Sequence, residues 1–470
     1  MNIFKAKTIT EVLDSANKNK GLEKTLGLGH LFLLGLGAII GTGIFGMTGI
    51  AAANMSGPAV VMSYAIAGMT AIFIALTYTE IAAMIPTSGG AYSYTFVAFG
   101  EIIAWIVSWM LILYFITSSS TVASAWSGYM VSMLNEGGVN IPFELTKNPA
   151  EGGLINLPAF LISLVVTLIL IRGTKESAII NGALVIIKIT AITLFIVVAV
   201  PHFDVKHWFE HGHTFENAFL SSPFMPFGIS GVVSGAAFVF FAYNGFDSIA
   251  SAAEEAKNPK RDLTLAILGS LAVCIILYMI VAALLVGIIP FHKINVDSPI
   301  PGALSYNGHN IVSSIIAGGV VLGMISVMIA QLFALSRIIL VVARDGLLPP
   351  VLTKIHKKYH TPYFSISSLG VIVAIIAGFV PLEVIGTLSS VGALFSFMIV
   401  CLSMMVLRRK YPDVKRPFKC PVPYLIGSFG VLLCLTLLFA TMKTVGLYTL
   451  IWLISGIVIY FVYYKIRVKQ

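Results

Sequence analysis

Long apolar stretches separated by short polar segments run along the whole chain. Twelve of them come near the roughly 20 residues that a helix needs to cross a bilayer. None shows the short alternating pattern of an outer-membrane barrel strand. The pattern predicts an all-α integral membrane protein with twelve transmembrane helices, at residues 31–52, 58–85, 102–134, 157–171, 178–201, 230–253, 264–289, 311–336, 363–380, 384–407, 422–440 and 446–464.

The first apolar stretch contains Gly37, Gly41 and Gly43 within seven residues. Glycine costs roughly 1 kcal/mol per helical position relative to alanine, so the cluster indicates that backbone groups leave the helix here. Irregular backbone at membrane depth is tolerated where protein or a water-filled cavity satisfies it, and in secondary transporters such breaks face a solute. The alternative is that the glycines serve close helix packing.

A second interruption occurs in the sixth stretch, where FFAYNGFD at 240–247 places Asn, Gly and Asp at mid-depth. The first and sixth helices are five apart, and an odd offset inverts orientation. Helices 1–5 and 6–10 are therefore predicted to be inverted repeats with broken first helices, which favours a solute site over packing alone. The expected organisation is a cytoplasmic tail at 1–26, a first repeat at 27–201, an extracellular loop at 202–229, a second repeat at 230–410, and two further helices with a short cytoplasmic C-terminus at 411–470.

Lys188 lies in the middle of the fifth predicted helix, roughly 15 Å from its start. A lysine at that depth costs about 2.5–3.5 kcal/mol, and such residues normally face an interior partner. One interpretation is a fixed tether to the carbonyl groups of the broken first helix. The other is a proton carrier, because a lysine that releases its proton inside the membrane could couple a proton gradient to helix movement. Intramembrane ionisable residues are functional by default, which favours both roles together.

Composition and charge agree with a membrane protein and give its orientation. Hydrophobic residues make up 58% of the chain and charged residues 10%, and the mean hydropathy of +0.95 excludes a soluble globular protein. If the N-terminus is cytoplasmic, 24 of the 29 Lys and Arg residues fall in inner segments, as the positive-inside rule requires. The net charge of +9 is thus a topology signal and does not indicate nucleic acid binding. No cleavable signal peptide is expected.

Three further segments have polar character without clear chemistry. Residues 87–100 are too polar and glycine-rich to span, and are expected to form a cytoplasmic or re-entrant turn. The hydroxyl-rich run at 118–121 is expected to serve packing, with solute contact as the alternative. A short amphipathic patch at 9–13 is expected to lie on the membrane surface.

No metal or cofactor is predicted. The four cysteines, Cys274, Cys401, Cys420 and Cys434, lack metal-ligand spacing. No phosphate-binding loop of the nucleotide-hydrolysing type occurs, which argues against a primary pump. The loop after the fifth helix carries a His-x-His sequence that could bind metal, although a solvated loop is the favoured interpretation. Its histidines are His202, His207, His211 and His213.

Several sequence strings, in a fixed order, resemble the amino acid–polyamine–organocation superfamily, which has the LeuT-like fold. Within it, the chain is similar to bacterial members of the cationic amino acid transporter family. The resemblance covers essentially the whole length and rests on GLEKTLG at 21–27, GLGAIIGTGIF at 35–45, PTSGGAYSY at 86–94, FFAYNGFD at 240–247, EEAKNPKRD at 254–262 and RDGLLP at 344–349.

The resemblance implies a binding site for a zwitterion. Backbone N–H groups of Thr42 and Gly43 would receive the substrate carboxylate, as helix-dipole effects favour. In proton-coupled relatives a lysine of the fifth helix takes the place of a bound sodium ion, and Lys188 stands at that position. Carbonyl groups would hold the ammonium, and the residues at those positions are Ile39, Ile40, Phe241, Ala242 and Asn244.

The chain departs from close relatives near this pocket. Asn244 stands where an aliphatic residue is common, and Gln331 stands where methionine is expected, which indicates a more polar pocket. Met110 and Leu113 replace an Asp and a Glu of the third helix. Loss of that Glu removes a candidate partner for Lys188 and leaves no obvious carboxylate for a cationic substrate, so the family name is not taken as the substrate.

The expected protein is a symporter of the bacterial cell membrane with both termini cytoplasmic, working by alternating access. It would carry a small neutral or polar amino acid together with a proton, without covalent chemistry. The alternatives are exchange of one solute for another, or transport of a different solute such as a thio-sugar. From another class, a membrane solute sensor would bind without translocating, and the short tails weigh against it.

Overall fold

The computed structural model describes residues 6–17, 24–209, 221–296 and 298–469. Within these ranges the chain is helical, with one isolated bridge between Leu26 and Ala256. The helices are α1 (Ile9–Asn17), α2 (Leu28–Ile39), α3 (Thr48–Ala51), α4 (Val60–Met84), α5 (Ala91–Phe99), α6 (Glu101–Glu136), α7 (Leu157–Ile171), α8 (Thr174–Ala199), α9 (Gly228–Val239), α10 (Ser248–Ser251), α11 (Pro259–Ile288), α12 (Pro299–Tyr306), α13 (Asn310–Arg344), α14 (Tyr363–Phe379), α15 (Leu382–Lys410) and α16 (Pro423–Lys469).

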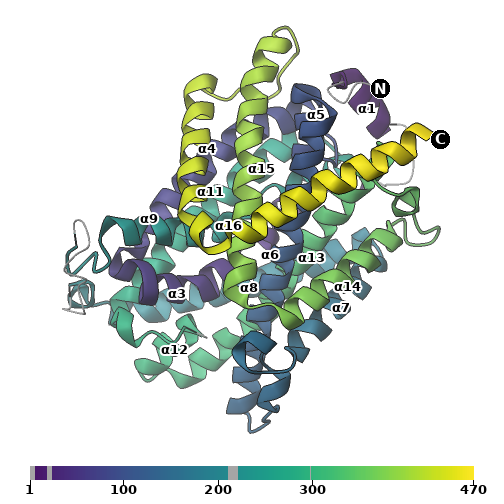
Figure 1. Cartoon of the computed structure of the whole chain (residues 1–470). Coiled ribbons are helices and arrows are strands. Elements are labelled where there is room, and N and C mark those ends of the chain that lie inside the picture. Colours follow the sequence, from purple (N-terminus) through teal and green to yellow (C-terminus); the bar gives the residue numbers. More distant parts are fainter. Residues whose placement is uncertain (1–5, 18–23, 210–220, 297, 470) are drawn as a thin grey trace.

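Nine segments of the described chain are long and apolar enough to cross a membrane. One of them, Leu28–Met84, contains the first two predicted spans, and the shorter apolar helices α7 and α14 coincide with two others. The predicted eleventh and twelfth spans fall on the two halves of α16, which bends sharply at its middle in Figure 1. The prediction of an all-helical membrane protein is confirmed.

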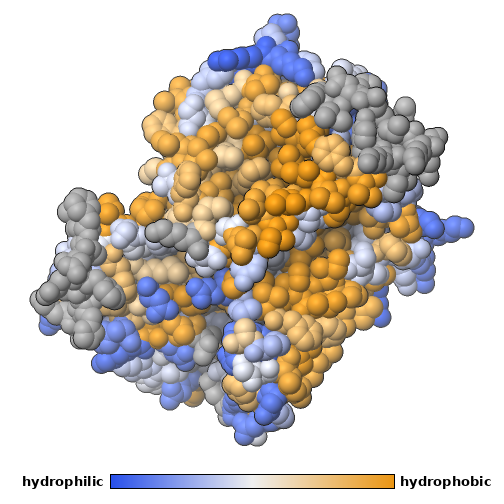
Figure 2. All heavy atoms as spheres, viewed as in Figure 1, coloured by the Kyte–Doolittle hydropathy of each residue, from blue (hydrophilic) through white to orange (hydrophobic). Residues whose placement is uncertain are grey.

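Hydrophobic residues cover most of the middle of the molecular face in Figure 2, and hydrophilic residues gather at its upper and lower ends. Helix α8 shows how one helix divides its surface between the exterior and the protein. The side chain of Ile186 is 61% exposed, whereas that of Lys188, roughly 200° further around the helix, is fully buried. Lys188 therefore faces the protein interior, as expected from the free-energy cost of exposing a charged side chain to lipid.

Two polar segments differ from the sequence-based expectation. The predicted turn at 87–100 contains the buried helix α5, bounded by Gly90 and Gly100, whose φ values are +50° and +91°. Glycine adopts such angles without steric cost, so the two glycines delimit a helix as well as a turn. The amphipathic patch forms α1, and its Ile9 and Val12 are buried against the protein rather than presented to lipid.

Candidate functional site

The first predicted interruption is present. Helix α2 ends at Ile39, and Ile40 is extended, with φ −74° and ψ 106°. Winding resumes at Gly43 as a π-helical turn that ends at Met47. The carbonyl of Gly41 accepts 3.2 Å hydrogen bonds from both Ile44 N–H and Phe45 N–H. The break is thus centred on Ile40 and Gly41, and Thr42, with φ −51° and ψ −29°, is the cap from which winding resumes.

The second predicted interruption is also present. Helix α9 tightens into a 3₁₀ turn over Phe240–Tyr243, and Asn244 is extended. Gly245 follows with φ +112°, a conformation that side chains other than glycine rarely adopt. A short helix, α10, begins at Ser248. The sixth predicted helix is therefore divided in two at Asn244–Asp247.

The two breaks contact each other directly. A Cβ atom added to Gly43 would lie 2.3 Å from Ala242 Cα, and one added to Gly245 would lie 2.7 Å from the carbonyl oxygen of Ala38. Neither approach is compatible with any residue larger than glycine unless backbone moves. These glycines therefore serve close packing, the alternative that the sequence offered, at a place where the backbone also leaves the helix.

Lys188 ties the first break to two other helices. Its ammonium donates to the carbonyls of Gly37 (2.7 Å) and Ile40 (2.5 Å) and to Ser326 Oγ of α13 (2.9 Å). These three acceptors match the three hydrogens of an ammonium group. A Cβ atom on Gly323 would lie 2.6 Å from Lys188 Cβ. The glycine thus lets α13 come close enough for Ser326 to serve as the third acceptor. The predicted tether is the geometry observed.

Two tyrosines that sequence reasoning missed donate to the same break. The hydroxyl of Tyr278 donates to the carbonyl of Ile39 (2.8 Å), and that of Tyr64 donates to the carbonyl of Gly43 (2.8 Å). Their rings meet edge-on, with centroids 5.9 Å apart. In an apolar segment a tyrosine looks like any core aromatic residue. The only available signal was that a buried hydroxyl needs a hydrogen-bond partner.

Polar side-chain atoms of three predicted site residues are buried without a hydrogen-bond partner among the described residues. They are both polar atoms of Asn244, Oε1 of Gln331 and Oγ1 of Thr42. Buried polar atoms are normally hydrogen-bonded, so each exception calls for an explanation.

Gln331 of α13 lies close to the first break. It comes one turn after Val327, whose Cγ2 would be 2.5 Å from a Cβ on Gly41. This face of α13 therefore points to the first break.

A buried carboxylate that was not proposed as a site residue belongs to the second break. Asp247 is 4% exposed, and its Oδ1 accepts a 3.1 Å hydrogen bond from the hydroxyl of Tyr114 on α6. Tyr114 directly follows Leu113, the position at which the resemblance led us to expect Glu. The chain thus has an acidic group in this region, although it comes from a different helix.

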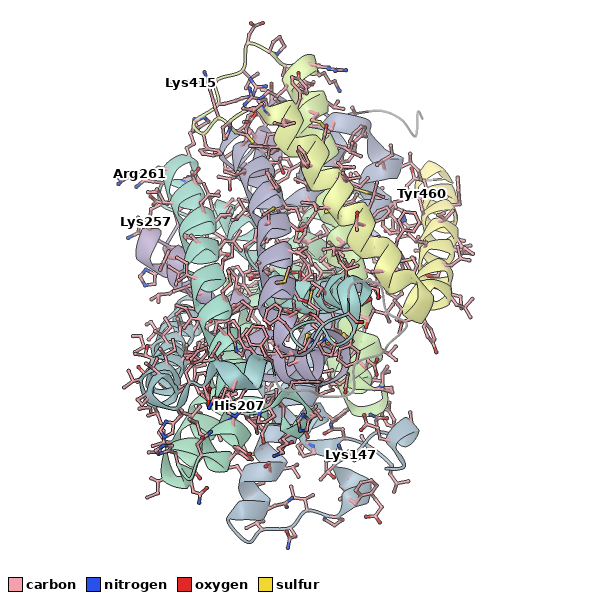
Figure 3. The ribbon with its side chains drawn as sticks, turned by 90° about the vertical axis from the view of Figure 1, so that its left-hand side faces the viewer. Lys147, His207, Lys257, Arg261, Lys415 and Tyr460 are labelled. Atoms are coloured by element: carbon pink, nitrogen blue, oxygen red, sulfur yellow. The ribbon has the colours of Figure 1, made fainter. Side chains whose placement is uncertain are left out.

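A cavity of about 460 Å³ leads from one end of the molecule to the first break. Of the predicted site residues, Thr42 lines it, and Asn244 and Gln331 are not among its lining residues. Lys147, Glu151 and Glu383 also line it. Figure 3 shows Lys147 in the lower half of the molecule together with His207, whereas Lys257, Arg261 and Lys415 lie in the upper half.

Ion pairs lie at the other end of the molecule. Lys7, just before α1, pairs with Asp345 at the end of α13. Asp345 also accepts a 2.7 Å hydrogen bond from the hydroxyl of Tyr92. Arg344 pairs with Glu254 at 3.3 Å, close to the end of the divided helix. The cavity thus reaches the first break from one end of the molecule, and these ion pairs lie at the opposite end.

Comparison with known proteins gives a consistent picture. The family model described as amino acid permease matches residues 26–463. The chain is 41% identical to the branched-chain amino acid permease BcaP of Bacillus subtilis (strain 168), over 98% of this chain and 97% of that protein. It is 38% identical to the methylthioribose transporter of the same organism, over 98% of each. Identity to the vacuolar cationic amino acid transporter 4 of Arabidopsis thaliana is 34%, over 84% of this chain and 66% of the relative.

Proposed function

Because the chain belongs to the amino acid permease family, and so is a membrane transporter and not an enzyme, we propose that it carries a small neutral or polar amino acid together with a proton. The proposal includes twelve spans with a LeuT-like arrangement of two inverted repeats. Two divided helices, five predicted spans apart, support this arrangement.

The observation that carries the proposal is the contact between the two breaks. At the first, winding resumes at Gly43, so Thr42 and Gly43 stand at a helix start, where positive partial charge favours a carboxylate. At the second, the 3₁₀ turn ends with the carbonyls of Phe241 and Ala242 near an extended Asn244. A zwitterion bound beside this contact would place its carboxylate on the first helix and its ammonium on the second.

The carbonyls of Ile39 and Ile40 have a smaller part in this proposal than the resemblance implied. Ile39 accepts from Tyr278, and Ile40 accepts from Lys188. A carbonyl oxygen has two lone pairs, so each could still accept a second donor. The ammonium of the substrate would nevertheless depend mainly on the sixth helix.

Proton coupling would act through Lys188. Loss of its proton leaves an amine that can no longer donate three hydrogen bonds at once to Gly37, Ile40 and Ser326. The first break would then be free to shift relative to α8 and α13. Protonation would thus control the position of the segment that binds the substrate.

Alternating access is supported by the contrast between the ends of the molecule. The cavity reaches Thr42 from the end that bears Lys147, and the pair between Lys7 and Asp345 lies at the opposite end, where it would close access. We place the closed end in the cytoplasm of a bacterial cell, because the labelled basic residues Lys257, Arg261 and Lys415 lie at that end (Figure 3). Both termini would then be cytoplasmic.

Transport of a thio-sugar is the second candidate. The unpartnered polar atoms of Asn244 and Gln331 would suit hydroxyl groups, and one of the similar proteins is a methylthioribose transporter. Exchange of one solute for another would need no net proton movement.

Uptake into proteoliposomes tests these candidates. Radiolabelled leucine, serine and methylthioribose would be supplied with and without an imposed pH gradient, for the native chain and for Lys188→Ala. Uptake of an amino acid that the gradient drives, and that Lys188→Ala abolishes, supports the proposal. Counterflow that ignores the gradient indicates exchange, saturable binding without uptake indicates a sensor, and uptake of methylthioribose alone identifies the thio-sugar as substrate.

A further inference from the structure

Two histidines from distant parts of the chain meet at the end of the molecule away from the ion pairs. His202 ends the 3₁₀ turn that follows α8, and His309 immediately precedes α13. Their Nε2 atoms lie 3.1 Å apart, and their rings are nearly perpendicular, at 79°. Both side chains are half-buried. The sequence directed attention to His202 only as part of a loop with His207, His211 and His213, of which the last two lie outside the described residues.

A neighbouring carbonyl fixes the proton position on His202. Its Nδ1 lies 3.0 Å from the carbonyl oxygen of Val198, one turn earlier. A carbonyl can only accept, so Nδ1 carries the hydrogen, and the neutral ring presents a lone pair at Nε2. Metal-bound histidines are commonly held in this way, with the second ring nitrogen donating to a backbone carbonyl. His202 is therefore oriented and protonated as a ligand would be.

The separation of the two Nε2 atoms suits a shared metal ion. Two Zn–N bonds of 2.0–2.1 Å at a tetrahedral angle place their nitrogens about 3.3 Å apart. In the neutral tautomer that carries its hydrogen on Nδ1, His309 presents a second lone pair at its own Nε2. His202 follows the C-terminal end of α8, where negative partial charge favours a cation, which offsets the opposite effect of the N-terminal end of α13 on His309.

From this geometry we propose that His202 and His309 form a binding site for a divalent transition metal ion, with zinc as the best match. In the described part of the chain, no group of three or more His, Cys, Asp or Glu residues could hold a metal. The remaining ligands are thus water molecules, and the ion exchanges with the medium. Soft and imidazole-binding ions such as Zn²⁺ are selected over Mg²⁺ and Ca²⁺, which prefer oxygen ligands.

The bound ion would join two helices that Lys188 already joins deeper in the protein. Lys188 links α8 to α13 through Ser326, and the histidine pair lies about 20 Å further along α8. A metal at the pair would fix the distance between the ends of these helices. This consequence is separate from substrate binding at the breaks, so the inference does not depend on the identity of the substrate.

Thermal unfolding of the full-length purified chain, after removal of any affinity tag, tests the site with Zn²⁺ as the probe. Saturating Zn²⁺ should raise the Tm of the native chain by about 2–4 °C, because a ligand that binds the folded form stabilises it. Mg²⁺ should leave the Tm unchanged. His202→Gln and His309→Gln should each abolish the shift.

Two matched variants identify the source of any shift. His207 lies on the same loop, with its Nδ1 2.8 Å from the carbonyl of Gly287, and His207→Gln should keep the full response. The double variant His211→Gln/His213→Gln should also keep it. Absence of a shift in the native chain, an equal shift in His202→Gln, or loss of the shift only in the double variant would each overturn the proposal.

A measurement on the native chain tests the site even if the histidine variants fold poorly. X-ray absorption at the zinc edge should show one zinc ion per chain with two imidazole ligands and the rest oxygen. A spectrum with oxygen ligands alone would show that the two histidines are only hydrogen-bonded to each other.

Discussion

At the first break, Lys188, Tyr278 and Tyr64 donate to the carbonyls that the helix releases. At the second break, the side chain of Asn244 is buried like that of Lys188. Both of its polar atoms nevertheless lack a partner among the described residues. The carbonyls of the first break are thus held by donors from the protein, whereas at the second Tyr114 holds Asp247 but the polar atoms of Asn244 stay available. We infer that the first break sets the conformation of the carrier and that the second contributes more to substrate selection.

Substitution of the contact glycines should have the largest effect, because it separates the two breaks. In Gly43→Ala the added Cβ would clash with the backbone of Ala242. In Gly245→Ala it would clash with Ala38, and alanine would also have to adopt the positive φ of this position. Both variants should lose all measurable uptake. Gly318→Ala is the matched control in α13, where a Cβ has open space, and it should transport normally. Normal uptake by Gly43→Ala would show that the breaks need not touch.

Lys188→Ala should destabilise the protein next most strongly. It leaves the carbonyls of Gly37 and Ile40 buried without their ammonium donor, at about 1–3 kcal/mol for each unsatisfied group. The Tm should fall and gradient-driven uptake should disappear. Lys206→Ala, at an exposed position of the loop that follows α8, is the control. An unchanged Tm in Lys188→Ala would contradict the role of this lysine as a tether.

Tyr278→Phe should have an intermediate effect. The ring contacts with Tyr64 and Tyr243 remain, but the carbonyl of Ile39 loses its donor. The expected loss of stability is about 1–3 kcal/mol, measured as a lower Tm, with reduced uptake. Tyr448→Phe, whose side chain is 55% exposed on α16, provides the comparison. Equal Tm values for the two variants would show that the hydroxyl of Tyr278 does not hold the break.

Asn244→Ala should have the smallest effect on stability and a clear effect on selectivity. Among the described residues no hydrogen bond to its side chain is lost, so the Tm should fall by less than it does in Tyr278→Phe. Competition for uptake should shift from polar towards apolar substrates, as it should in Gln331→Met. A large fall in Tm without a change in selectivity would show that Asn244 stabilises the fold and does not select the substrate, contrary to the role inferred for the second break.

The sequence was most informative where local residues conflict with an apolar helix. Glycines in the first span, the Asn-Gly-Phe-Asp sequence in the sixth, and Lys188 each violate the expectation for a lipid-exposed helix. Each marks a place where the structure departs from regular packing. The conflict itself was the signal, because polar or flexible groups at that depth need a reason.

Features without such a conflict were missed. Tyr64 and Tyr278 match the apolar pattern around them, and their partners lie 21 and 239 residues away. The meeting of His202 and His309, 107 residues apart, was equally invisible. Helix α5 lies in the segment 87–100, which was predicted as a cytoplasmic or re-entrant turn because it is too polar and glycine-rich to span. Long-range contacts of ordinary residues depend on how the helices pack, which one-dimensional patterning does not specify.

The most direct test of a substrate site between the breaks is a cryo-electron microscopy structure of the protein with the substrate identified by uptake. The account predicts ligand density between Thr42 and Ala242, with the carboxylate at the N–H groups of Thr42 and Gly43 and the ammonium at the carbonyls of the sixth helix. Density confined to the cavity near Lys147, or a structure in which either helix runs continuously through its break, would contradict it.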